Sequence, residues 1–146
     1  MKNIRFISAF SLLLLLTSFS LHSFGQTGDI NVTVTNLKNT DGYIFIGLFN
    51  KADDFPIDGK QYRKDYVKVS SKTFTYTFKN IPAGDYAIAV YHDENADHKC
   101  NRNMMGIPTE RYGFSNNIKP VLSAPSFSKV KFNLVSSVDI SIRLFD

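Results

Sequence analysis

The 146-residue chain contains no tryptophan, a single cysteine at Cys100, and no run of more than two consecutive lysine or arginine residues. One cysteine cannot form a disulfide within the chain, so the fold must depend on an apolar core. Nucleic-acid binding requires a positively charged stripe, so the absence of a basic cluster argues against this function. After residue 25 no apolar stretch approaches the roughly 20 residues that span a bilayer.

The N-terminus has the pattern of a cleavable secretory signal peptide. Lys2 and Arg5 form a positive head, an apolar run with five consecutive leucines follows, and residues 23–25 give a small-x-small cleavage pattern. Polar residues interrupt the run before it reaches the length of a membrane anchor. We therefore expect removal of residues 1–25 and export of one domain, residues 26–146, to the periplasm or the medium.

Apolar and polar residues alternate over much of the remaining chain, which is the period-2 pattern of β-strands. The stretches 43–49 and 86–92 are apolar on both faces and should be central, whereas 61–69 is charged enough to form an edge. No helix is expected. The pattern predicts an all-β fold, a seven-stranded antiparallel β-sandwich. The expected strands are 30–35, 43–49, 61–69, 73–78, 86–92, 130–134 and 138–144.

Two connections between these strands stand out. Asp41-Gly42 lies between two alternating runs and is a strong short signal for a β-hairpin. The second connection, residues 93–125, has neither strand nor helix periodicity and is rich in Asn, Gly, Pro and Asp. Irregular loops of this length inside a small domain are usually functional or disordered, so any site is expected there.

The start of that long loop is rich in side-chain oxygens at alternate positions. Calcium takes 6–8 oxygen ligands, and a short loop can supply them from alternate side chains and one backbone carbonyl. We predict a calcium site that uses these oxygens, one carbonyl, and a carboxylate returning from farther along the chain. The predicted ligands are Asp93, Asn95, Asp97, Lys99 through its carbonyl, Asn101 and Glu110, with Glu94 as the less favoured carboxylate.

Two positions depart from the EF-hand pattern. His98 replaces the glycine of position 6, and Met104 replaces the bidentate glutamate of position 12. These differences exclude a complete EF-hand and predict low affinity. Asp and Asn side chains also accept hydrogen bonds from nearby backbone in turns, so an Asx-rich loop without any ion is the alternative.

Other chemistry is less well supported by the sequence. The spacing of His92, His98 and Cys100 matches none of the common zinc patterns. Cys100 is expected to be either buried or a reactive thiol. No nucleophile elbow and no paired carboxylates are legible, so a non-enzymatic role is expected.

A second candidate site lies at the far end of the long loop. Its aromatic rings could anchor the loop to the sheets, which is favoured, or line a groove for a sugar or peptide beside polar side chains. In the second case the partner would be an extracellular glycan or protein. The residues of this ligand site are Tyr112, Phe114, Ser115 and Asn116.

Three segments carry a resemblance to a known family: Ile81-Pro82-Ala83-Gly84-Asp85-Tyr86-Ala87-Ile88-Ala89-Val90-Tyr91-His92-Asp93-Glu94-Asn95, Gly106-Ile107-Pro108-Thr109-Glu110 and Tyr112-Gly113-Phe114-Ser115-Asn116. Together they resemble the DUF2141 family of exported bacterial proteins of unknown function. The resemblance implies a single transthyretin-like, Greek-key sandwich and an Asp-x-Asn-x-Asp-Gly loop with a further Asp four residues on. In this chain His98 stands where the motif has its glycine, and Asn101 stands where it has the further Asp. The resemblance implies no catalytic residues.

The combined expectation is an exported binding or structural module with a calcium-stabilised loop. The alternative is a carbohydrate- or peptide-binding accessory domain that uses residues 112–116. An enzyme is the least favoured of the three classes, because no complete catalytic set is visible.

Overall fold

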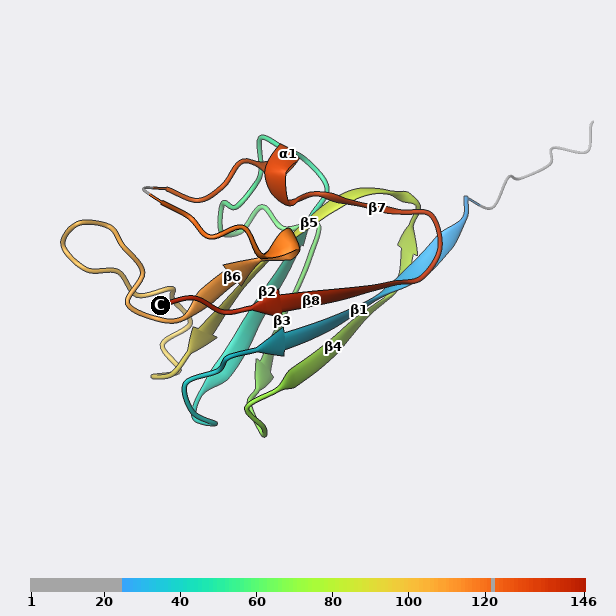
Figure 1. The fold of residues 1–146 in the computed structure, drawn as a ribbon. Helices are drawn as coiled ribbons and strands as arrows, with labels where there is room; N and C mark the ends of the chain where they lie inside the picture. Colours follow the sequence, from blue (N-terminus) through green and yellow to red (C-terminus); the bar gives the residue numbers. More distant parts are fainter. Residues whose placement is uncertain (1–24, 122) are drawn as a thin grey trace, which may run out of the picture.

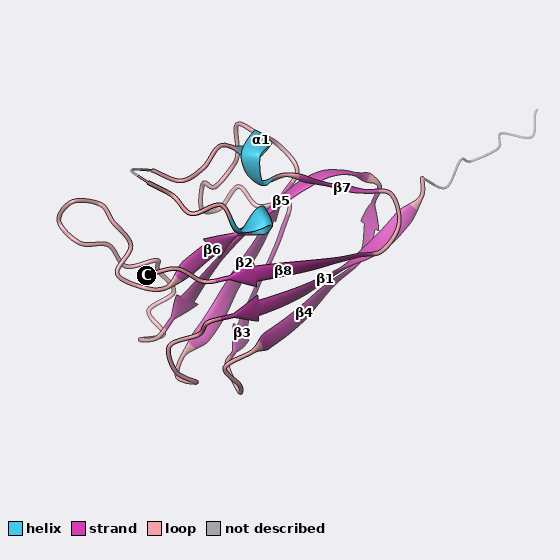
Figure 2. Ribbon diagram, viewed as in Figure 1, coloured by secondary structure: helices cyan, strands magenta, loops and turns pink. Residues whose placement is uncertain are grey.

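The computed structural model describes residues 25–121 and 123–146, so the expected signal peptide lies outside the described residues except for Gly25. The described part is almost entirely strand and loop (Figure 2). Within it, no helix has the length and apolarity needed to cross a bilayer. Its elements are β1 (Thr27–Thr35), β2 (Tyr43–Phe49), β3 (Arg63–Lys68), β4 (Phe74–Pro82), β5 (Gly84–Asp93), β6 (Tyr112–Phe114), the 3-10 turn η1 (Ser115–Asn117), α1 (Phe127–Val130), β7 (Phe132–Leu134) and β8 (Val138–Arg143).

The strands form two sheets, and the all-β prediction is confirmed (Figure 1). One sheet has three strands in the order β4-β1-β8. The other has five, in the order β3-β2-β5-β6, and β7 pairs with β5 beside β6. The charged strand β3 lies at an edge, as predicted, whereas β2 and β5 are internal.

Three details of the predicted fold are wrong. The described residues form eight strands rather than seven, because the three-residue β6 lies inside the segment expected to be one long loop. The pairing is not wholly antiparallel, since β1 and β8 run parallel. Residues 127–130 form a single helical turn where no helix was expected. Elements of three or four residues are too short to show a period in the sequence.

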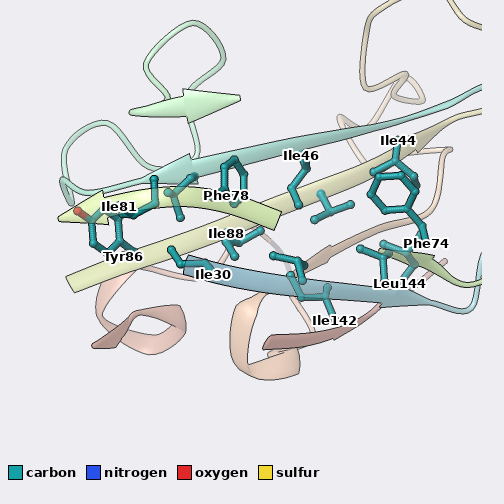
Figure 3. Packing of buried hydrophobic residues seen from close by; sticks show 14 of the residues in the cluster. Ile30, Ile44, Ile46, Phe74, Phe78, Ile81, Tyr86, Ile88, Ile142 and Leu144 are labelled. Atoms are coloured by element: carbon teal, nitrogen blue, oxygen red, sulfur yellow. The ribbon is translucent and has the colours of Figure 1, made fainter. Parts of the chain in front are cut away.

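The main core lies between the two sheets (Figure 3). Alternate residues of each long strand point into it, and Ile44, Ile46 and Leu48 of β2 are fully buried, as their spacing predicted. Each such side chain contributes about 1.5–3 kcal/mol by leaving water. Seventeen buried residues from both sheets make up this cluster, which explains why no disulfide is needed.

The Asp41-Gly42 turn does not close a hairpin, contrary to the prediction. It connects β1 to β2, which belong to different sheets, so the chain crosses from one side of the core to the other. The turn still needs glycine, because Gly42 has φ +68° and a Cβ there would lie 1.9 Å from the carbonyl oxygen of Asp93. This turn is therefore packed against the start of the predicted calcium loop.

A second apolar cluster covers one end of the outer face of the five-stranded sheet. Phe49 and Ala87 of the internal strands are buried there beneath Phe55, Phe114 and Val130. The Phe55 ring packs edge-to-face with neighbouring rings, with centroids 5.1 Å from Phe49 and 5.8 Å from Phe114. This covering explains why β2 and β5 are apolar on both faces.

Candidate functional site

The predicted calcium loop begins where β5 ends and projects beside the C-terminus of the chain (Figure 1). Its second half doubles back on itself: Asn103 N donates to Ile107 O at 2.9 Å and Thr109 N donates to Asn101 O at 2.8 Å. This return is what brings Glu110 next to Asn101. The loop then rejoins the fold at β6, which pairs with β5.

Asp93 is the anchor of the loop, and its side chain is fully buried. Its Oδ2 accepts hydrogen bonds from the Tyr66 hydroxyl and, at 2.8 Å, from His98 N. Its Oδ1 accepts the longer 3.3 Å bond from Asp97 N and no other hydrogen bond from a described residue. Burial raises the pKa of Tyr66, so the phenol remains a proton donor to the carboxylate at neutral pH. One oxygen of Asp93 is thus engaged by the protein and the other only weakly.

The remaining predicted side chains form a hydrogen-bonded chain around Asp97. Asn101 Nδ2 donates to Asp97 Oδ2 at 3.0 Å, and Asn95 Oδ1 accepts from Asp97 N at 3.1 Å. Asp97 Oδ1 in turn accepts from Lys99 N at 2.9 Å. The amide of Asn101 is the main cause that holds the pKa of Asp97 below its usual range. Asn95, Asp97 and Asn101 are thus joined by hydrogen bonds, and Lys99 takes part through its N–H rather than through the predicted carbonyl.

Glu110, which the sequence ranked above Glu94, is also linked to Asn101. It is buried, and its Oε2 accepts from Asn101 N at 3.1 Å. Burial raises the pKa of Glu110, against the N–H of Asn101, which lowers it. Glu94 points elsewhere, because its carboxylate pairs with Lys38 at 3.2 Å. Only one of the two candidate glutamates therefore reaches the loop.

His98 takes the backbone conformation of the glycine that it replaces. Its φ is +63°, in the left-handed region that position 6 of a calcium loop requires. A residue with a Cβ pays about 1–2 kcal/mol to adopt this conformation. The imidazole stacks on the Tyr66 ring with centroids 4.1 Å apart, which helps to hold the backbone there. A histidine at this position thus makes the turn more costly than a glycine would, while its backbone still lies in the left-handed region.

The donor set of the loop suits a hard cation better than a transition metal. Across residues 25–121 and 123–146, no group of three or more His, Cys, Asp or Glu side chains is placed to hold a metal, so an ion here would also need amide and carbonyl oxygens. One such atom is available: Asn101 Oδ1 is buried and has no hydrogen-bond partner within the described chain. An unpaired buried amide oxygen is costly unless it finds a ligand or water.

The histidines and the cysteine do not meet as a metal site. His92 is fully buried, and its Nε2 lies 2.7 Å from Asp41 O. Its Nδ1 is buried and has no partner among the described residues. Cys100 is half-buried, and burial raises its pKa to about 11, so the thiol is protonated at neutral pH.

The second predicted site is only partly assembled. Tyr112 and Phe114 line a cleft of about 520 Å³ on the outer face of the five-stranded sheet. Ser115 is buried and structural, since its hydroxyl donates to Val130 O at 2.6 Å and accepts from Ile88 N at 3.0 Å. The amide of Asn116 is likewise used, because it donates to backbone carbonyls at 3.2 and 3.1 Å.

Sequence reasoning missed the other residues of this cleft. Its floor includes Phe45, Ala89 and Tyr91, and Arg102 stands in its wall. A signal for the floor was present, because strands 43–49 and 86–92 are apolar on both faces and a two-sheet fold covers only one. Nothing local in the sequence indicated which segments would form the walls.

Comparison with known proteins gives one match. A family model described as "Uncharacterized protein conserved in bacteria (DUF2141)" matches residues 32–141. No curated protein and no solved structure gives a match.

Proposed function

The chain belongs to the DUF2141 family of uncharacterized bacterial proteins, and from that premise we propose that it is an exported, non-enzymatic binding module whose loop 93–110 is ordered by one calcium ion. The family description assigns no activity, so the proposal depends on the loop itself. The observation that carries it is the hydrogen-bonded network that links Asp93, Asp97, Asn101 and Glu110, together with the buried amide oxygen of Asn101, which has no partner among the described residues.

The charge of the loop supports this role. The charges of Asp93 and Asp97 both act to raise the pKa of Glu110, whereas the charge of Lys99 lowers the pKa of Asp97. A bound calcium ion would offset the mutual repulsion of the carboxylates and accept Asn101 Oδ1 as a ligand. Its chemistry here is structural: it would tie the start of the loop, at Asp93, to its end, at Glu110.

The alternative is an Asx-rich turn that needs no ion, and the same hydrogen bonds are compatible with it. The two differ in what stabilises the loop. For a weak extracellular-type site with a dissociation constant of about 0.1–1 mM, calcium at about 10 mM stabilises the folded protein by about 1.4–2.7 kcal/mol. An ion-free turn gains nothing.

The test is calorimetric titration of the purified protein with calcium, followed by thermal unfolding with calcium, magnesium and chelator. We expect binding heat and a melting temperature raised by calcium more than by magnesium. Glu110→Gln should abolish the shift, whereas the matched variant Glu94→Gln should keep it, because Glu94 pairs with Lys38 instead. No heat and no shift at millimolar calcium would refute the metal part of the proposal.

The non-enzymatic part rests on the chemistry of the candidate nucleophile. Burial keeps the Cys100 thiol protonated, with a pKa of about 11, and a thiol is a poor nucleophile. Turnover in a hydrolase screen that is lost whenever any single residue of the cleft is replaced would count against this part.

We also propose that the fold has the transthyretin-like, Greek-key arrangement. The strand connectivity of an experimentally determined structure would check this.

A further inference from the structure

We propose that the cleft on the outer face of the five-stranded sheet binds a small organic carboxylate with an apolar body, whose acid group pairs with Arg102. This inference rests on the proposed binding role but not on the calcium ion. It names a ligand class for the cleft beside residues 112–116, for which the sequence had suggested a sugar or a peptide.

The size of the cleft suits a small molecule. Its volume of about 520 Å³ lies within the range of about 300–1,000 Å³ that is typical of ligand pockets. It would hold roughly 17 water molecules at about 30 Å³ each. A long peptide or a glycan chain would extend well beyond this space.

The floor of the cleft is rigid and aromatic. Phe45 of β2 and Tyr91 of β5 lie on adjacent strands and stack with centroids 4.9 Å apart. Tyr112 and Phe114 of β6 continue the surface, with centroids 6.0 Å apart. Because all four rings stand on hydrogen-bonded strands, a ligand that lies on them pays little to order its site.

Apolar side chains are exposed along the rim of the cleft. Met105, Ile107 and Val121 all line it, and they are 82%, 49% and 92% exposed. Single exposed apolar residues are ordinary on a protein surface, but three around one concavity are the pattern of a binding site. They favour a ligand whose body is largely apolar over a sugar, which needs many hydrogen-bond partners.

The polar groups of the cleft select the charge of the ligand. Arg102 forms no ion pair within the described chain, and its Nη1 makes only a long 3.4 Å hydrogen bond to Gly106 O. Arg102 and Tyr112 both line the cleft, and the charge of Arg102 acts to lower the pKa of Tyr112, which burial raises. Guanidinium groups bind carboxylates through two parallel hydrogen bonds.

The one carboxylate in the lining does not compete for Arg102. Asp58 Oδ1 accepts from Gly59 N at 2.8 Å and from Gln61 Nε2 at 3.1 Å, so it is engaged within its own turn. Arg102 therefore lies beside an apolar floor and is not paired with a carboxylate of the described chain. A carboxylate attached to an apolar body satisfies both features.

The test uses two carboxylates. Decanoate represents acids with an acyl chain, and 2-naphthoate represents aromatic acids. Decan-1-ol and 2-naphthol serve as the matched uncharged probes. Binding to the purified full-length exported protein is measured by calorimetry and by amide chemical-shift changes, with calcium and again with chelator. We expect one of the carboxylates to bind at least tenfold more tightly than its uncharged analogue, with shifts at β2, β5 and β6.

Two variants separate this inference from nonspecific apolar binding. Arg102→Gln should weaken the carboxylate at least tenfold and leave the uncharged probe unchanged, whereas Arg63→Gln, on β3 outside the cleft, should change neither. Ala89→Leu should fill the floor and abolish both, and chemical-shift mapping on the unaltered protein decides the location if that variant does not fold. Binding in chelator supports the cleft even where the calcium proposal fails. No carboxylate binding, or equal carboxylate binding to the unaltered protein and to Arg102→Gln, overturns it.

Discussion

Replacing Tyr66 by phenylalanine should loosen the acidic loop without altering the strand that carries it. The substitution removes one oxygen, which donates a hydrogen bond to the buried carboxylate of Asp93. The ring itself should stay in place, because it stacks on Tyr43 at 4.6 Å and on His98 at 4.1 Å. The variant therefore isolates the contribution of a single hydrogen bond.

The expected loss is about 1.5 kcal/mol of unfolding free energy. Hydrogen bonds to charged groups contribute about 1.5–3 kcal/mol. The lower end applies because Asp93 keeps its bonds from the backbone N–H groups of Asp97 and His98 and is not left unpaired. Tyr66 is also only half-buried, so water can replace part of the missing donor.

Urea unfolding of both proteins measures the loss directly, in calcium-free buffer and again with calcium. The matched control is Tyr43→Phe on the neighbouring strand, because that hydroxyl has no hydrogen bond to a described residue, and a change within about 0.5 kcal/mol is expected. Amide hydrogen exchange at Asp97 and His98 should quicken only in Tyr66→Phe. Equal stability of the two variants would refute the role assigned to the Tyr66 hydroxyl.

Three further predictions follow from the same region. Gly42→Ala should lower the free energy of unfolding by more than about 2 kcal/mol, because the new Cβ would lie 1.9 Å from Asp93 O and the backbone is left-handed. The control Gly59→Ala has open space around it and φ +82°, so it should lower the free energy of unfolding by only about 1 kcal/mol in the same urea assay. Burial raises the pKa of Glu110, so the folded protein without metal binds this proton more tightly than the unfolded chain. The tighter binding of this proton adds to the free energy of unfolding. That addition is fully present below the ordinary pKa of 4.5 and is lost as the pH rises through the pKa of Glu110 in the folded protein. Unfolding curves of Glu110→Gln should lack this trend. Because the pKa of Cys100 is about 11 rather than 9.0, alkylation by iodoacetamide at neutral pH should be about 100-fold slower in the folded protein than in urea, and equal rates would contradict its burial.

Much of the strand content could be predicted because it depends on local periodicity. A strand with one buried face shows its alternation within a few residues, so β2, β5 and the charged edge β3 were legible without any pairing information. The same is true of the loop, since alternate oxygens from Asp93 to Asn101 stand close in sequence. Glu110 was reachable by chemistry alone, as the carboxylate that a returning chain could supply.

Other features depend on which segments meet in space, and local pattern does not encode that. Asp41-Gly42 has the composition of a hairpin turn in either case, but the partners of β1 turned out to be β4 and β8, so the turn crosses the core. β6 exists because Gly113 lets the chain approach closely: a Cβ there would lie 2.8 Å from Ile142. Such an approach leaves no periodic trace in three residues.

The sequence by itself determined that this chain is rich in β-strands and carries an oxygen-rich loop after residue 92, because side-chain period and loop composition are properties of neighbouring residues. Only the tertiary structure decided that Arg102 and the rim of loop 100–108 would face the rings of Phe45 and Tyr91 across a cleft. Those groups are brought together by strand pairing and by the return of the loop, and the energy of such contacts depends on distance in space rather than on separation along the chain.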